Sequence, residues 1–183
     1  MISKLVLTLD DAKRIAAAAE AFAKTNNWRV VIAVVDDGGH LLYLQRSHDT
    51  QFGSIKLAIK KARAAVAFQR PTKASEDAVL GGRLIHLALP GVIPAEGGVP
   101  LTRDNQIIGG LGISGVRSFE DGQVAQAGAN ALTGSLKTTA LDRTALLKDS
   151  KCSFTLCKLR IFALSRLVLP SLATFFNTLL ETH

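Results

Sequence analysis

The hydrophobic pattern along positions 5–132 switches between a helical and a strand period, which predicts a fixed order of elements. Residues 10–26 are rich in alanine and predict a helix, capped by Thr8 with Asp11 completing a capping box. Residues 29–35 form a nearly continuous β-branched run, typical of a strand buried on both faces. A turn with two glycines then returns the chain as a second strand over residues 40–45.

A second helix is predicted over residues 51–68, where apolar residues recur at about 100° per residue on one stripe. Lys61 lies at the edge of that stripe, whereas the other basic residues of this helix fall on the opposite face. A short helix is expected over residues 75–80.

The last elements are a second hairpin and a final helix. Residues 99–102 and 106–114 predict two strands around an Asp-Asn turn, and glycine inside the second strand indicates close approach of another backbone or a ligand. The final helix is expected from Ser118 to about residue 132, with Asp121 as its capping-box partner. The order of helices and hairpins predicts an α+β fold in which helices flank a largely antiparallel sheet.

Composition limits the classes of function. The 183 residues, 48% of them hydrophobic, suit one folded domain, which we place at residues 1–134. The net charge is +7, of which residues 1–134 carry +3 (15 basic minus 12 acidic) and residues 135–183 carry +4 (7 minus 3). No basic stripe with interleaved aromatics is visible, so nucleic acid is not an expected partner.

Residues 135–183 differ in composition and are treated as an atypical C-terminal extension. They contain both cysteines, five positions apart, which match neither a zinc pattern nor a disulfide framework. Arg160, Arg166 and Pro170 interrupt the apolar stretch, which argues against a transmembrane helix. A helix on a membrane surface or a partner, or an out-of-frame end without selected function, are the open alternatives. The N-terminus shows no signal-peptide pattern, which favours a cytoplasmic protein.

Several short motifs, in register, resemble the GlcG/HbpS family, to which the PduO C-terminal domain also belongs. They are the stretch from Val30 to Gly39, Arg46, Ser54, Lys61-Ala62, Gly97-Gly98-Val99-Pro100-Leu101, residues 108–115, and Asp121 followed by Ala125 and Ala127-Gly128. The resemblance implies a profilin-like fold, assembly into homodimers or higher oligomers, and binding of haem or another tetrapyrrole in some members. Other members are encoded beside genes of glycolate, propanediol or aromatic catabolism.

The histidines are the main candidates for coordinating haem iron, because the iron needs an axial imidazole, thiolate or thioether. Some haem-binding relatives use a histidine of the first helix, and residues 10–26 contain none. His48, in a polar loop before the second helix, is the best-placed candidate and the predicted metal ligand. His40 is interpreted as a surface turn residue and His86 as a packed or hydrogen-bonded core residue.

Several other residues are candidates for binding the ligand, and most of them also have a structural interpretation. Arg46 and Lys61 could hold haem propionates or a small carboxylate. Alternatively, Arg46 pairs with Asp37 or Asp49, and Lys61 extends from an apolar edge to solvent. Gly97-Gly98 could expose main-chain N–H groups as an anion-binding nest or simply begin the hairpin. Ser54, by the family match, and Glu96, which is next to the Gly97-Gly98 turn, are also predicted ligand-binding residues.

The sequence therefore predicts a small-ligand-binding protein, haem or tetrapyrrole first, that is non-catalytic or accessory to a catabolic pathway. An enzyme is the alternative, in which Glu96, with Lys61 and His48, abstracts a proton from a small carboxylic acid. A structural partner of a catabolic complex is the third class.

Overall fold

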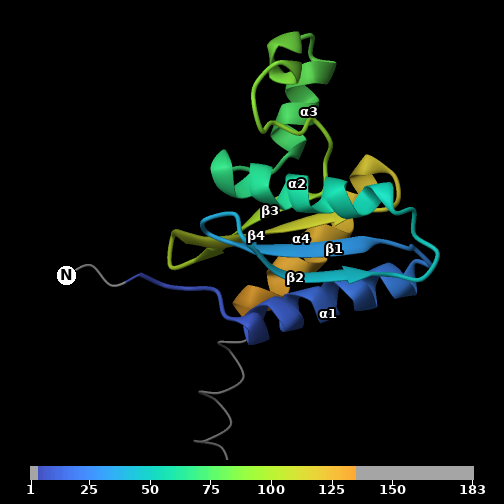
Figure 1. Ribbon diagram of the computed structural model, residues 1–183, viewed down its shortest axis with the longest axis vertical. Coiled ribbons are helices and arrows are strands. Elements are labelled where there is room, and N and C mark those ends of the chain that lie inside the picture. The colour runs from blue at the N-terminus through green and yellow to red at the C-terminus, as the bar shows by residue number, and fades with distance from the viewer. Residues whose placement is uncertain (1–3, 135–183) are drawn as a thin grey trace, which may run out of the picture. The chain divides into compact units, whose positions relative to one another are not determined.

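The computed structural model describes residues 4–134, which form one antiparallel sheet packed between helices (Figure 1). The strands are β1 (Val31–Asp36), β2 (Leu41–Arg46), β3 (Gly98–Arg103) and β4 (Gln106–Ser114). Their order in space is β2-β1-β4-β3, and every neighbouring pair is antiparallel. The helical elements are α1 (Leu9–Thr25), α2 (Gly53–Ala67), α3 (Lys73–Leu80), the 3₁₀ turn η1 (Leu84–Leu87) and α4 (Ser118–Gly134). The predicted α+β class is confirmed.

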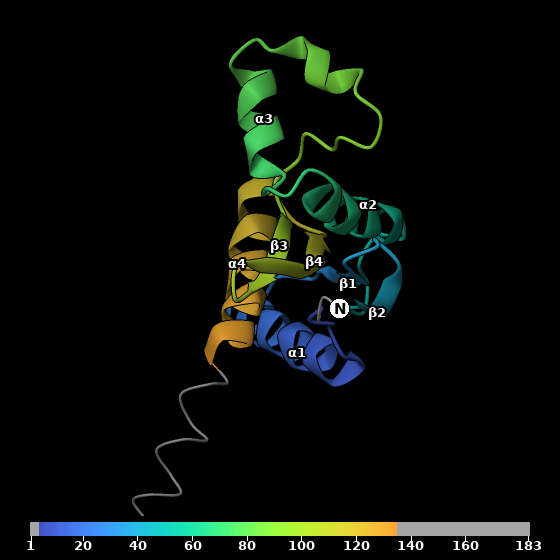
Figure 2. The same cartoon turned by 90° about the vertical axis from the view of Figure 1, so that its left-hand side faces the viewer.

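The elements form three layers, with the sheet in the middle (Figure 2). Helices α1 and α4 cover one face, where the larger apolar core contains Ile15, Ile32 and Val124. Helix α2 covers the other face, where Ala58 packs against Val31 and Ala33. Because successive residues of a strand point to opposite faces, β1 supplies side chains to both cores. Its residues from Val31 to Val35 are almost fully buried, as predicted for a central strand.

The glycines of β4 let α2 approach the sheet closely. A Cβ at Gly112 would lie 2.6 Å from the main-chain N of Ala62, and one at Gly110 would lie 2.7 Å from Val66 Cγ2. Any side chain at these positions would push α2 off the sheet. The predicted close backbone approach is therefore confirmed, and the approaching group is a helix.

The two capping predictions had different outcomes. Thr8 caps α1, and the reciprocal bonds with Asp11 complete the capping box as predicted. At α4 the predicted box of Ser118 and Asp121 is wrong. The Ser118 hydroxyl donates to Glu76 Oε2 at 2.7 Å, while the Asp121 carboxylate accepts from Lys61 Nζ and from the main-chain N–H of Val116.

Helix α3 and η1 project away from the three layers (Figure 1). His86 lies in η1 and is 4% exposed, which confirms its interpretation as a packed residue. The predictions for residues 135–183, including those on Cys152 and Cys157, lie outside the described residues. The domain boundary at residue 134 therefore stays a prediction.

Candidate functional site

Four of the predicted ligand-binding residues lie together where β3 begins. Glu96, Gly97 and Gly98 follow one another at the entry to this edge strand, and Lys61 approaches them from α2. A Cβ at Gly97 would lie 3.0 Å from Lys61 Nζ. Because Gly97 has no side chain, the Lys61 ammonium can lie directly against the main chain where β3 begins.

Lys61 forms a buried ion pair with Asp121. Its Nζ donates to Asp121 Oδ2 at 2.7 Å, and the two side chains are 1% and 3% exposed. The alternative that Lys61 extends from an apolar edge to solvent is wrong, because its side chain is buried and paired with Asp121. The pair joins α2 to α4 past the margin of the sheet.

Burial raises the pKa of Asp121 to about 6, although the Lys61 charge and its hydrogen bond act to lower it. Asp121 also accepts a hydrogen bond from the main-chain N–H of Val116 at 3.3 Å. Sequence reasoning missed this residue as the partner of Lys61. An acid three positions after a serine is typical of a helix cap, so the local pattern concealed the long-range pair.

Gly97 and Gly98 make room for packing. A Cβ at Gly97 would lie 2.7 Å from the carbonyl oxygen of Ile113, and one at Gly98 would lie 2.6 Å from Thr72 Cγ2. The Gly98 N–H donates to Thr72 Oγ1 at 2.9 Å, and the Gly98 carbonyl accepts from the Thr72 N–H at 2.9 Å. Since its N–H is already used, Gly98 does not serve the predicted anion nest, and the alternative of a hairpin entry describes it better.

Glu96 lines a cavity of about 310 Å³ together with these glycines. Burial raises the pKa of its carboxyl group, while Lys73, whose Nζ lies 3.8 Å from Glu96 Oε2, acts in the opposite direction. The cavity is lined by Pro71, Lys73, Glu96, Gly97, Gly98, Val99, Gly122, Gln123 and Gln126. Both acidic and basic groups are present, so its charge favours neither a cation nor an anion.

His48 lies elsewhere, in a cavity of about 370 Å³ between the end of α1 and the segment after β2. Trp28, Lys24 and Arg29 line the same cavity. Both cations already have partners, since Lys24 lies 2.8 Å from Glu20 and Arg29 lies 3.8 Å from Asp49. Because His48 and Glu96 line different cavities, the structure does not bring together the three residues of the enzyme hypothesis.

Arg46 and Ser54 are separate from both cavities. Arg46 is exposed at the end of β2, the edge strand opposite β3, so the structure does not bring it to Lys61. The alternative partners considered for Arg46 are taken, since Asp37 pairs with Lys4 and Asp49 with Arg29. Ser54 is buried in the first turn of α2.

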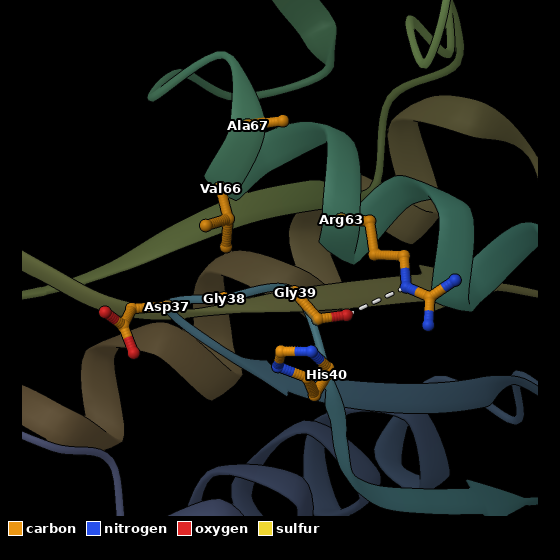
Figure 3. A pocket seen from close by; sticks show the side chains of 7 residues that line it. All are labelled: Asp37, Gly38, Gly39, His40, Arg63, Val66 and Ala67. Carbon is orange, nitrogen blue, oxygen red and sulfur yellow. Dashed lines mark hydrogen bonds between the residues drawn. The ribbon is translucent and has the colours of Figure 1, made fainter.

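A further cavity, of about 440 Å³, lies between the β1–β2 turn and α2 (Figure 3). His40 and Arg63 line it together with Gly38, Gly39, Val66 and other residues of the turn and helix. His40 is exposed, as its interpretation as a turn residue predicts. No sequence pattern connects His40 with Arg63, because 22 residues separate them and only the packing of α2 beside the turn brings them close.

Within residues 4–132, no group of three or more His, Cys, Asp or Glu side chains is placed to hold a metal ion. None of the helices up to residue 134 combines the length and the apolar character needed to cross a membrane.

A four-stranded antiparallel sheet between helices, with small cavities at its margins, defines residues 4–134 as an α+β domain. Its sequence matches the family model described as "Haem degrading protein HbpS-like" over residues 7–130. The chain therefore belongs to the HbpS-like family of haem-degrading and haem-binding proteins.

Individual relatives agree with this assignment. Protein GlcG of Escherichia coli K12 is 43% identical over 114 residues, which are 62% of this chain and 85% of GlcG. The corrinoid adenosyltransferase PduO of Salmonella typhimurium is 34% identical over 132 residues, which are 70% of this chain but only 39% of PduO. The similarity to PduO therefore concerns a part of that enzyme.

Solved structures show the same fold. The crystal structure of HbpS has a TM-score of 0.66 and 30% identity, and the match covers 72% of this chain and 94% of HbpS. The crystal structure of a complex of PduOC with haem has a TM-score of 0.62 and 35% identity, covering 69% of this chain and 95% of PduOC. One structural neighbour at this level of identity is thus a haem complex.

Proposed function

We propose that this chain binds haem or a related tetrapyrrole and acts as a non-catalytic or accessory protein, assembling with further copies of itself. The observation that carries the proposal is the presence of cavities that combine an imidazole, a basic side chain and apolar groups. Such a combination suits a molecule with a metal centre, acidic substituents and a large apolar surface. Membership of the HbpS-like family and the haem complex of PduOC support the same ligand.

The residues present fit this ligand chemically. An exposed imidazole can supply a nitrogen to iron, and guanidinium or ammonium groups can pair with propionate carboxylates. The cavities that contain histidines have volumes of about 370 and 440 Å³, near the lower end of the range for small-molecule sites, about 300–1,000 Å³. We therefore expect a bound tetrapyrrole to remain partly exposed unless a second copy of the chain covers it.

Absorption spectroscopy tests the proposal directly. The full-length chain is titrated with hemin, and the Soret band is compared with that of free hemin in the same buffer. The proposal predicts a shifted Soret band that saturates, whereas a spectrum that stays that of free hemin at every ratio would reject haem binding. Light scattering of the same samples measures whether the chain self-associates and whether hemin changes its mass.

A further inference from the structure

We infer that His40 is the residue that coordinates haem iron, at the cavity between the β1–β2 turn and α2, and that Asp36 and Arg63 position the ligand there. This inference rests on the proposed haem-binding function. It differs from the sequence prediction of His48 as the metal ligand. The two histidines line different cavities, so the two assignments can be separated by experiment.

Asp36 fixes the imidazole of His40. Asp36 Oδ1 accepts hydrogen bonds from the main-chain N–H groups of Gly38 at 2.9 Å and His40 at 2.8 Å, which hold the carboxylate in place. Asp36 Oδ2 lies 3.3 Å from His40 Nδ1.

An ionised carboxylate has only acceptors, so His40 Nδ1 must carry the proton that joins it to Asp36. The lone pair of the neutral ring then lies on Nε2, on the side away from Asp36. A carboxylate that holds one ring nitrogen while the other binds a metal is the usual arrangement around metal-ligating histidines. No hydrogen bond or ion pair orients the His48 ring within the described residues.

Arg63 supplies a fixed cation beside this imidazole. Its Nε donates to the carbonyl oxygen of Gly39 at 2.8 Å, and Figure 3 shows the guanidinium and the His40 ring both beside that carbonyl. Within residues 4–132, no carboxylate pairs with the terminal nitrogens of Arg63, which leaves them for a propionate. In the His48 cavity, by contrast, Lys24 and Arg29 already face Glu20 and Asp49.

The rest of the cavity suits the edge of a flat apolar ligand. Val66 and Ala67 of α2 form an apolar part of the cavity wall, and Gly38 and Gly39 of the turn have no side chains that would fill the cavity. A Cβ at Gly38 would lie 2.9 Å from the His40 ring, so glycine there allows the imidazole to lie across the turn. With a side-chain exposure of 82%, His40 is open to a ligand that arrives from solvent.

The experiment compares hemin binding by two matched variants, His40→Ala and His48→Ala. Both remove one exposed imidazole from a cavity, and circular dichroism checks that each variant keeps its secondary structure. We expect His40→Ala to weaken hemin binding about 100-fold and to return the Soret band toward that of free hemin. His48→Ala should keep the affinity and the spectrum of the unmodified chain. Free imidazole added to His40→Ala should restore the shifted band.

Two positioning variants extend the test. Asp36→Asn should lower hemin affinity about tenfold, because it removes the charge that holds the ring. Arg63→Gln should lower the affinity about threefold, whereas Arg46→Gln, its exposed counterpart on β2, should have no effect. Hemin dimethyl ester, which lacks free propionates, should bind the unmodified chain and Arg63→Gln equally well.

The outcomes distinguish a failure of haem binding from a failure of the assignment of His40 as the iron ligand. If the unmodified chain does not shift the Soret band, the proposed function fails. If the unmodified chain binds but His40→Ala binds equally well, or if His48→Ala loses the shifted band, the assignment of His40 is overturned while haem binding stands. Only loss in His40→Ala together with retention in His48→Ala supports the inference.

Discussion

The buried pair of Lys61 and Asp121 gives the sharpest prediction about stability. Replacing Asp121 with alanine would leave the Lys61 ammonium, 1% exposed, without its partner. Breaking a buried ion pair by removing one member costs about 3–5 kcal/mol, because the remaining charge stays uncompensated. A domain of this size has an unfolding free energy of about 5–15 kcal/mol, so Asp121→Ala should remove a large part of it.

Urea unfolding followed by circular dichroism measures this effect. The matched control is Glu20→Ala, which breaks the exposed pair with Lys24 on α1 and should cost less than about 1 kcal/mol. The double variant Lys61→Met/Asp121→Leu removes both charges and fills the space, so it should be within about 1 kcal/mol of the unmodified chain. The reasoning is refuted if Asp121→Ala costs no more than Glu20→Ala, or if the double variant is less stable than Asp121→Ala.

The remaining predictions also concern the folded domain, and urea midpoints measure each of them. Because burial raises the pKa of Asp121 to about 6, the contribution of Asp121 to the free energy of unfolding should fall as the pH rises from 4 to 6. Asp121→Asn should flatten this dependence of stability on pH, and an unchanged slope in that variant would contradict the prediction. Gly112→Ala should destabilise strongly, since its Cβ would lie 2.6 Å from Ala62 N, whereas Gly53→Ala, in open space, should not. Thr8→Ala should cost about 1 kcal/mol through the lost cap, and no loss would refute that role.

Most of the fold could be predicted because its signals are local. The β-branched run of β1 and the Thr8 cap of α1 depend on neighbouring residues alone, and both were confirmed. The second hairpin was recognisable from its Asp-Asn turn, in which Asp104 and Asn105 have φ values of 50° and 60°. The glycines of β4 indicated a close backbone, although not which element would approach.

The site was harder to predict because its contacts join residues far apart in the chain. The sequence drew attention to Lys61 and Gly97, and the structure does bring these two together. It could not show that Asp121, 60 positions from Lys61, would neutralise that lysine. It also could not show that Arg46 and Lys61 would lie toward opposite edges of the sheet, since strand order is not a local property.

His40 illustrates the same limit. A histidine after a glycine turn is typical of an exposed surface residue, and exposure alone does not distinguish a solvated ring from a metal ligand. The distinction comes from Asp36, which orients the ring, and from Arg63, which α2 places beside the turn. Only the packed structure shows these three residues as one group.

Equilibrium dialysis against hemin, followed by the pyridine haemochromogen assay, tests the central claim that this chain holds haem at a defined site. Full-length protein is dialysed to equilibrium over a range of hemin concentrations, and bound iron porphyrin is counted against protein. Haem binding at a defined site predicts saturation at an equimolar ratio, with His40→Ala far from saturation under the same conditions. Uptake that rises without saturating, or that is the same for the unmodified chain and for denatured protein, would contradict it.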